Sequence, residues 1–312
     1  MRIGIDIHGG DYAPEVTVRG SIEATRYLSA EDKLVLIGNS ADIKRISKEN
    51  NFDPARFDII HTEESIGMGD HPAKSFIKKP NASIVLGFGL LSQGEIDAFA
   101  SAGNTGAMLV GAMQVVKSIP GVIRPSITAT VPRISDKPTL LLDVGINPDC
   151  KPDVLYQYGI LGSLYAENVL NIDNPKIGLL NIGSEEEKGN LLTKTTFQAM
   201  KDTTEFNFIG NVEGNDFFTD KVDVVVCDGF VGNVVLKTAE NVYRLIKERN
   251  ITDEFFEKFN FENYGGTPVL GINKPVIIGH GVSNIKAIKN MILHTREVVQ
   301  SNLLEKIKKA FK

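Results

Sequence analysis

The feature that most constrains the fold is a unit that recurs along the whole chain. A short apolar run leads into a turn rich in glycine and small polar residues, and a stretch with helical spacing of apolar residues follows. The first unit has an apolar run at residues 3–7, a turn at residues 9–11 and a helical pattern at residues 16–28. Alternating strands and helices predict a parallel sheet covered on both faces, with right-handed connections. The predicted fold class is therefore α/β, a Rossmann-like layered fold with a mainly parallel central sheet.

The same pattern predicts the other elements. Strands are expected at residues 33–38, 57–61, 98–101, 127–131, 139–143, 177–180, 206–210, 222–227 and 275–279. Helices are expected at residues 41–49, 82–93, 107–116, 154–169, 191–200 and 234–247, and a long helix closes the chain. Residues 63–80 are expected to form a surface loop with a short helix. Because no linker or shift in composition marks a boundary, we expect one domain over residues 1–312, with a short helical excursion near residues 244–264.

Composition limits the class of protein. With 312 residues, of which 42% are hydrophobic, the chain can bury a core without disulfides or a structural metal. A net charge of -5 argues against nucleic acid as a partner. The two cysteines, Cys150 and Cys227, lack metal-binding spacing and are expected to be core thiols. No signal-peptide pattern or transmembrane run is present in the sequence, so we expect a cytoplasmic protein.

Five strand-to-helix turns combine glycine with amide, hydroxyl or acidic residues. They lie at residues 9–11, 101–106, 143–147, 183–190 and 228–233. Glycine allows the backbone to approach a ligand, and the helix that follows offers unpaired N–H groups to an anion. Any one of these turns could be an ordinary helix cap. Because parallel strands end at one edge of a sheet, their recurrence predicts a polar cleft that accepts phosphate.

Standard nucleotide motifs are absent from these turns. After Gly183 the sequence has Lys188 before Gly189, the reverse of the order in a phosphate-binding loop, and three glutamates precede the lysine. Gly87 and Gly89 fall inside a helical pattern rather than after a strand, so a dinucleotide fingerprint is unsupported. No triad or metal-ligand spacing is found. We therefore expect no metal and no cofactor.

The stretch at residues 176–190 illustrates the pattern most fully. An apolar strand ends at a turn around Gly183, and Ser184 with Glu187 has the spacing of a capping box ahead of the helix at residues 191–200. Lys188 then lies where a cation can meet an anion. His8 and His280 also follow strands at this edge. For His280 two interpretations stay open, a donor or acid near the substrate and a turn residue that binds backbone.

Taken in order, these turns closely resemble the motifs of the PlsX-type phosphate acyltransferases. The resemblance covers nearly the whole chain and rests on Asp6 with residues 9–11, on residues 101–107, 143–147, 179–189 and 228–233, and on residues 264–266 and 280–281. It implies transfer of a fatty acyl group from acyl carrier protein to inorganic phosphate, which gives acyl phosphate for phospholipid biosynthesis. It also implies a homodimer and a fold related to phosphate acetyltransferases and isocitrate-dehydrogenase-like proteins.

The resemblance also implies site residues. Lys188 is expected to bind phosphate or the charge that develops in the reaction, and Asn233 to donate its amide to phosphate or carbonyl, with His280 as a third catalytic candidate. The expected phosphate-binding residues are Gly10, Asp11, Asn104, Thr105, Gly106, Asn147, Gly183, Asp228 and Gly232. No covalent intermediate with the enzyme is required.

The chain departs from the family between residues 248 and 263. Many members carry a long basic and apolar helical hairpin there that contacts the membrane, whereas this link is short. Its phenylalanines, Phe255, Phe256, Phe259 and Phe261, stand among glutamates that oppose binding to anionic lipid. We therefore expect core or dimer-interface roles for them, and peripheral contact with the inner face of the membrane stays an open alternative.

Three questions stay open at the level of sequence. Candidates for docking the acidic acyl carrier protein are Lys78, Lys79, Arg124, Arg133, Lys306, Lys308, Lys309 and Lys312. The acyl donor could instead be acyl-CoA, or the protein could be a noncatalytic module that binds phosphoanions. A nicotinamide dehydrogenase is disfavoured by the missing fingerprint. The preferred length of the acyl chain is not readable from the sequence.

Overall fold

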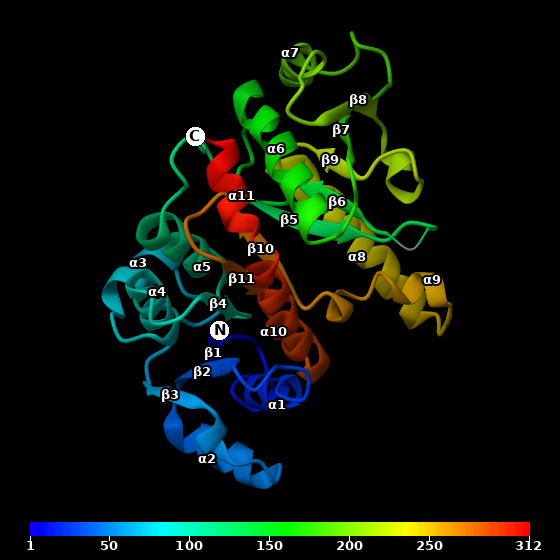
Figure 1. Ribbon diagram of the computed structural model, residues 1–312. Coiled ribbons are helices and arrows are strands. Elements are labelled where there is room, and N and C mark those ends of the chain that lie inside the picture. Colours follow the sequence, from blue (N-terminus) through cyan, green and yellow to red (C-terminus); the bar gives the residue numbers. More distant parts are fainter. Residues whose placement is uncertain (136) are drawn as a thin grey trace. The chain divides into compact units, whose positions relative to one another are not determined.

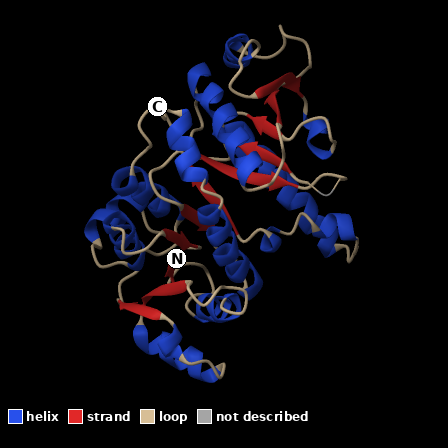
Figure 2. Ribbon diagram, viewed as in Figure 1, coloured by secondary structure: helices blue, strands red, loops and turns tan. Residues whose placement is uncertain are grey.

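Strands and helices alternate along the chain, as the sequence pattern predicts (Figures 1 and 2). The computed structural model describes residues 1–135 and 137–312. Contacts between Cα atoms divide the chain into two units. The first comprises Met1–Lys117 and Phe261–Gln300, and the second comprises Ser118–Asn260 and Ser301–Lys312. Whether the two units together form the single domain expected from the sequence stays a prediction.

The sheet of the first unit is mainly parallel. Its strand order is β3-β2-β1-β4-β11-β10. The strands are β1 (Arg2–Asp6), β2 (Lys33–Gly38), β3 (Asp58–His61), β4 (Ala98–Ser101), β10 (Gly266–Leu270) and β11 (Val276–Gly279). Strand β1 runs parallel to both β2 and β4, and β11 runs parallel to β4. Strand β10 is antiparallel to β11. The carboxyl ends of β1, β4 and β11 therefore meet at one edge.

Helices of the first unit pack through small residues. They are α1 (Glu15–Ala24), α2 (Ser40–Glu49), α3 (Pro72–Lys78), α4 (Ser83–Gln93), α5 (Thr105–Gly111) and α10 (Ile285–Gln300), with a π-helical turn at Ala112–Val116 and 3-10 turns at Pro54–Arg56 and Phe261–Asn263. Helices α1 and α10 lie side by side (Figure 1), and a Cβ on Gly20 would come within 2.5 Å of Ile288. Gly87 faces the ring of Phe99 from within α4, which confirms that Gly87 and Gly89 belong to a helix and not to a nucleotide loop.

The second unit repeats the architecture. Its strand order is β5-β6-β9-β7-β8. The strands are β5 (Ser126–Val131), β6 (Thr139–Leu142), β7 (Lys176–Leu180), β8 (Asn207–Val212) and β9 (Val224–Val226). The helices are α6 (Pro152–Asn168), α7 (Leu191–Met200), α8 (Gly229–Glu248), α9 (Glu254–Glu257) and α11 (Leu303–Ala310), with a 3-10 turn at Gly214–Phe218. Strands β6, β9, β7 and β8 are parallel. Strand β5 is antiparallel to β6, because only a short link joins them.

The predicted fold class, a mainly parallel α/β fold, is confirmed. Every predicted strand is present, with ends displaced by at most two residues. Several details differ within the described residues. Strand β10 is not predicted, and the pairs β10–β11 and β5–β6 are antiparallel. Helix α1 ends at Ala24 rather than at residue 28, α5 gives way to a π-helical turn at Ala112, α8 begins at Gly229 rather than at residue 234, and the closing helix is interrupted at Asn302, whose φ is 55°.

The short link after α8 contains the single turn of α9. Phe255, Phe256 and Phe259 are half-buried, and Phe259 packs against the core cluster of the second unit that includes Val225. The ring of Phe259 lies 6.1 Å from that of Phe218 and 5.6 Å from that of Phe255. Phe259 thus has the core role expected for these phenylalanines. In the described part of the chain, no helix combines the length and apolar character needed to cross a bilayer.

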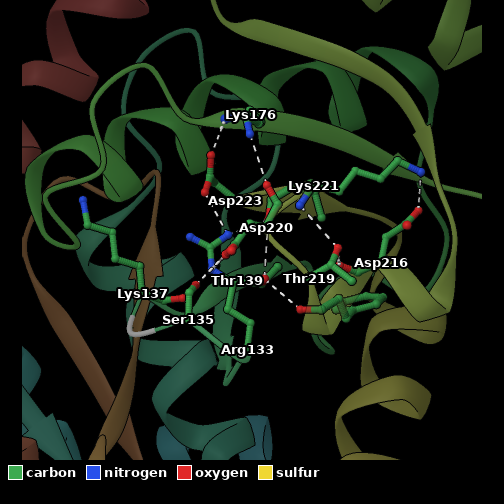
Figure 3. Close-up of polar contacts among 12 residues, drawn as sticks. Arg133, Ser135, Lys137, Thr139, Lys176, Asp216, Thr219, Asp220, Lys221 and Asp223 are labelled. Carbon is green, nitrogen blue, oxygen red and sulfur yellow. Dashed lines mark hydrogen bonds and ion pairs between the residues drawn. The ribbon is translucent and has the colours of Figure 1, made fainter.

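Arg133 belongs to a buried network at the amino ends of β6 and β9 (Figure 3). Its side chain is 5% exposed and lies 2.9 Å from Oδ1 of Asp223, and it also donates to the Val222 carbonyl at 3.0 Å. The other carboxylate oxygen of Asp223 accepts the N–H of Lys176 at 2.8 Å. Arg133 therefore cannot serve as a docking residue, because its charge is enclosed and paired. The sequence missed this because a lone arginine in a loop is normally exposed.

Candidate active site

The predicted site residues of the first unit gather at the carboxyl ends of its parallel strands. The N–H of Asp11 donates to the Gly281 carbonyl at 2.8 Å, which joins the turn after β1 to the turn after β11. Gly10 has a φ of 109°, and a Cβ there would lie 3.2 Å from the same carbonyl oxygen. This left-handed conformation and close approach explain why glycine precedes Asp11.

Asp6, at the end of β1, forms hydrogen bonds to the turn after β1 and to the end of β4. It is buried, and its two carboxylate oxygens accept the hydroxyl of Ser101 at 2.7 Å and the N–H of His8 at 3.0 Å. The Ser101 hydroxyl in turn accepts the N–H of Gly103 at 2.9 Å. Burial raises the pKa of Asp6. Asp6 is not among the predicted site residues. A single carboxylate within an apolar strand is nevertheless a signal that the side chain is buried and holds neighbouring turns in place.

The turn after β4 is held mainly by Asn104. Its side-chain oxygen accepts the N–H of Ala107 at 3.0 Å, which caps α5, and its amide nitrogen lies 3.0 to 3.2 Å from three carbonyl oxygens of residues 67–70. Thr105 is exposed at the first turn of α5. A Cβ on Gly106 would lie 2.3 Å from Pro72. The geometry therefore gives Asn104 a positioning role in the loop, and the predicted contact of these three residues with phosphate stays a prediction.

His280 follows β11 at the same edge. It is half-buried, with its ring 4.8 Å from the ring of Phe261, and its carbonyl accepts the N–H of Ser283 at 3.0 Å. His8 behaves differently, because its Nε2 accepts the N–H of Asn39 at 3.2 Å and so holds the turn before α2. Of the two histidines noted in the sequence, His8 has a structural contact, while the role of His280 stays a prediction.

In the second unit, Asp143 follows β6 at the edge formed by the carboxyl ends of β6, β9 and β7, and it holds the turn that comes next. Asp143 is fully buried, and its carboxylate accepts the N–H of Asn147 at 2.7 Å. The Asn147 side chain donates to the Pro125 carbonyl and to the Tyr158 hydroxyl, both at 2.7 Å. Burial raises the pKa of Tyr158, so its hydroxyl stays protonated. Asn147 is thus held within the turn by Asp143, which lies in this predicted turn but is not among the predicted site residues.

Helix α8 begins against this turn. Asp228 caps it by accepting the N–H of Val231 at 2.9 Å, and the N–H of Gly229 donates to the Asn147 carbonyl at 2.8 Å. A Cβ on Gly232 would lie 1.9 Å from the Asp143 carbonyl oxygen, so only glycine permits this approach. Asn233 is exposed, and its amide donates to the Val144 carbonyl at 3.2 Å. The fold therefore brings together Asn147, Asp228, Gly232 and Asn233.

The turn after β7 corrects one prediction. The cap of α7 is Asn190, whose side chain accepts the N–H of Thr193 at 2.9 Å, and Ser184 with Glu187 forms no capping box because both lie before a further turn. Asn181 donates its amide to the Lys188 carbonyl at 3.1 Å. Gly189 has a φ of 90°, and a Cβ there would lie 2.2 Å from the Asn181 side chain. These contacts fix the backbone on both sides of Lys188.

Lys188 carries an exposed side chain on this rigid turn. A Cβ on Gly183 would lie 2.9 Å from Cγ of Lys188, so the lysine stem crosses the buried Gly183. Within residues 1–135 and 137–312, its ammonium has no carboxylate or other hydrogen-bond partner. The neighbouring glutamates, Glu185 to Glu187, are also exposed. Lys188 is therefore a positioned cation that remains available to an anion.

A pocket lies beside this turn. Its volume is about 600 Å³, and its lining comes from the loop after β6 at residues 148–150, the start of α7 at residues 190–192 and the start of α8 at residues 228, 230 and 231. All three segments belong to the second unit. The predicted residue Asp228 therefore lines the pocket, Lys188 lies two positions before the lining residue Asn190, and the volume is that of a small-molecule site.

Comparisons with known proteins identify the family of the chain. The family model described as "Fatty acid synthesis protein" matches residues 1–251 and 245–306. A phosphate acyltransferase of Dictyoglomus thermophilum is 40% identical over 326 residues, which cover 98% of this chain and 96% of that protein. A phosphate acyltransferase of Desulfitobacterium hafniense is 42% identical over 329 residues, which cover 99% and 97%.

A solved structure supports the fold independently. The phosphotransacetylase from Streptococcus pyogenes matches with a TM-score of 0.69 at 17% identity, over 96% of this chain and 94% of that one. At this identity the likeness shows the fold alone, and it confirms the expected relation to phosphate acetyltransferases. The family model and the two relatives match nearly the whole chain, and they show that this chain belongs to the fatty acid synthesis protein family of PlsX-type phosphate acyltransferases.

Proposed function

We propose that this protein transfers a fatty acyl group from the thioester of acyl carrier protein to inorganic phosphate. The product is acyl phosphate, a precursor for phospholipid biosynthesis. The observation that carries the proposal is the unpaired Lys188 ammonium on a turn fixed by Asn181 and Gly189, beside a small-molecule pocket. The names of the relatives, phosphate acyltransferase, support the reaction class.

The reaction needs little from the protein beyond positioning and charge. A phosphate oxygen attacks the thioester carbonyl carbon, a carbon–oxygen bond forms, and the carbon–sulfur bond breaks. The thiolate of acyl carrier protein leaves and takes up the proton that phosphate gives up. Negative charge builds on the carbonyl oxygen during attack, and each well-placed donor contributes about 10²- to 10³-fold in rate. Holding phosphate beside the carbonyl contributes several kcal/mol more.

Lys188 and Asn233 are the proposed donors. The lysine supplies a point cation to phosphate or to the developing oxyanion. The Asn233 amide is exposed at the first turns of α8 and has one carbonyl partner, Val144, which leaves one of its two N–H bonds for a ligand. His280 is the third proposed catalytic residue, as a donor or acid near the substrate.

The other proposed residues bind phosphate through their turns. They are Gly10, Asp11, Asn104, Thr105, Gly106, Asn147, Gly183, Asp228 and Gly232. The side chains of Asn104 and Asn147 are occupied by protein oxygens, so their contribution is the backbone that they hold in place. Asp228 likewise acts through the helix start that it caps, because a free carboxylate would repel phosphate.

The proposal is tested by incubating the purified protein with acyl-acyl carrier protein and inorganic phosphate. We expect acyl phosphate and free acyl carrier protein to form in equal amounts, and only when both substrates are present. Comparison of kcat/KM for the acyl-acyl carrier protein and acyl-CoA distinguishes the two donors. Phosphate binding without turnover of either thioester would instead identify a noncatalytic phosphoanion-binding module.

We further propose a cytoplasmic homodimer. The outer face of α8 supports the dimer, because Val234, Val242 and Leu245 are 52%, 51% and 54% exposed on one apolar face. Sedimentation at micromolar concentrations should give the dimer mass, and Leu245→Glu should shift the protein toward monomer. A wild-type protein that sediments as a monomer throughout would contradict the proposal.

We propose separately that contact with the membrane is weak or absent. Glu254 and Glu257 frame the half-buried phenylalanines of α9, so we expect weak or no binding to anionic lipid. Flotation with vesicles that contain anionic phospholipid tests this. The protein should stay with the soluble fraction, and co-flotation would restore a peripheral membrane role.

A further inference from the structure

The pocket beside Lys188 combines apolar walls with a particular distribution of charge. Leu191 and Phe230 line it and are 82% and 65% exposed. Both lie in the first turn of a helix, α7 and α8 respectively, in a protein whose other large apolar side chains mostly fill the core. Exposed apolar side chains that face a concave surface indicate a site for an apolar ligand.

The charged side chains that line the pocket favour an uncharged part of a substrate. Two carboxylates, Asp149 and Asp228, line the pocket, while among the described residues no lysine, arginine or histidine does. Asp149 is exposed, and Asp228 is tied to the N–H of Val231. The charged side chains of the lining are therefore both negative, and Arg124 donates to the Asp149 carbonyl at 3.3 Å without lining the pocket. The positive charge of this edge, Lys188, lies outside the lining.

The pocket and the lysine are nevertheless neighbours in the chain. Asn190 lines the pocket and caps α7 two residues after Lys188. Phosphate must reach the thioester carbonyl carbon from one side, and the acyl chain extends from that carbon on another side. The proposed anion-binding lysine next to a pocket lined by Leu191, Leu192 and Phe230 would provide this division, and the volume of about 600 Å³ is large enough for a long alkyl chain.

We propose that this pocket, between the starts of α7 and α8, binds the alkyl chain of the acyl donor, while Lys188 serves the phosphate side. The inference rests on the proposed function and adds a location for the chain. It also predicts that Phe230 and Leu191 determine how activity depends on chain length.

The first test is the chain-length profile of two variants. Phe230→Ala removes one wall, and Leu191→Trp narrows the opening. With butyryl-, octanoyl- and hexadecanoyl-acyl carrier protein, we expect kcat/KM to change by less than about twofold for the shortest donor and by about tenfold or more for the longest, because each buried methylene contributes to binding. The matched control is Ile134→Trp, which replaces a side chain that is 79% exposed in the loop before β6. It should leave all three values unchanged.

The second test uses Cys150, which lines the pocket, as a native reporter. Its rate of modification by N-ethylmaleimide is measured by intact mass with S-dodecyl pantetheine or S-methyl pantetheine present. Both probes carry the same uncharged arm and neither can be cleaved by phosphate. The dodecyl probe should slow modification by about fivefold or more, and the methyl probe should have no effect.

Each other outcome has a distinct meaning. Equal protection by both probes would show that the pocket holds the pantetheine arm and would overturn the inference. A parallel loss for all donors in Phe230→Ala, or modification that depends on protein concentration because a second copy covers the pocket, would overturn it too. If the dodecyl probe protects Cys150 but no donor yields acyl phosphate, the pocket assignment stands and the proposed function fails.

Discussion

Among single residues, Lys188 is the one whose proposed catalytic role rests most directly on the geometry of its turn. The turn around it is fixed by Asn181 and by Gly189 in the left-handed region, while its own ammonium stays unpaired among the described residues. A side chain that takes no part in holding the fold can be removed without loss of stability. Its contribution should therefore be visible in turnover alone.

Lys188→Ala and Asn233→Ala should each lower the rate of acyl-phosphate formation by about a hundredfold or more, since each removes a donor to phosphate or the oxyanion. Thermal unfolding should be unchanged for Lys188→Ala. Lys194→Ala, which removes an exposed lysine from α7, is the matched control and should retain full activity. Near-normal turnover in either site variant would refute its assignment.

Cys150 gives a prediction about pH. Burial raises its pKa to about 11, and the reactive form is the thiolate. The rate of alkylation by iodoacetamide should therefore rise about tenfold for each pH unit from about 7 to 10, whereas an ordinary thiol with a pKa near 8.5 would level off. Cys227 is buried and has a raised pKa, so it should react only on unfolding. Intact mass of wild type and Cys150→Ser measures both, and a plateau below pH 9 would contradict the effect of burial.

At the scale of elements, glycine decides how α8 meets the sheet. The Cβ of an alanine at position 232 would lie 1.9 Å from the Asp143 carbonyl oxygen, although alanine is the better helix former. The start of this helix carries Asp228, Phe230 and Asn233, so its position sets both the predicted donor and the wall of the pocket.

Gly232→Ala should therefore destabilise the protein by about 1–3 kcal/mol or more, because α8 must shift away from β6. Gly89 of α4 offers the contrast, since a Cβ there would have no neighbour within 4 Å. Gly89→Ala should be neutral or stabilise by up to about 1 kcal/mol. Urea denaturation of the two variants measures the difference, and equal midpoints would show that the close approach at Gly232 is relieved at no cost.

For the molecule as a whole, the candidate site and the enclosed ion pair lie at opposite ends of the strands of the second unit. The candidate site lies at the carboxyl ends of β6, β9 and β7, and the network of Arg133 with Asp223 lies at the amino ends (Figure 3). Breaking a buried ion pair leaves a buried charge without its partner, which costs far more than breaking an exposed one.

Arg133→Ala should lower the free energy of unfolding by about 3–5 kcal/mol. Lys221→Ala removes the half-exposed partner of Asp216 and should cost about 1 kcal/mol or less. Hydrogen exchange of the amides in β6 and β9 reports the loss within the second unit. Equal protection in both variants would show that the enclosed pair stabilises no more than the exposed one.

Local sequence patterns were enough to predict the strands, the glycine turns and the family. The spacing of apolar residues in strands and helices is a local property, so strands such as β2 and β7 can be recognised from a few residues. The turns are local too, because the conformation of Gly10 or Gly189 limits which residue can stand there. The ordered set of these turns led to the family, which the comparisons confirm.

Which polar side chains already have hydrogen-bond partners within the protein became clear from the folded chain and not from the sequence. The amides of Asn104 and Asn147 are held by carbonyl oxygens from other loops, and the charge of Arg133 is enclosed by Asp223, about 90 positions away. Strand β10 escaped prediction because Pro268 interrupts the strand pattern and a pairing with β11 supplies what local propensity lacks. The reason is common to all of them: these contacts join residues far apart in sequence, and their energies depend on which distant groups the fold brings within hydrogen-bonding distance.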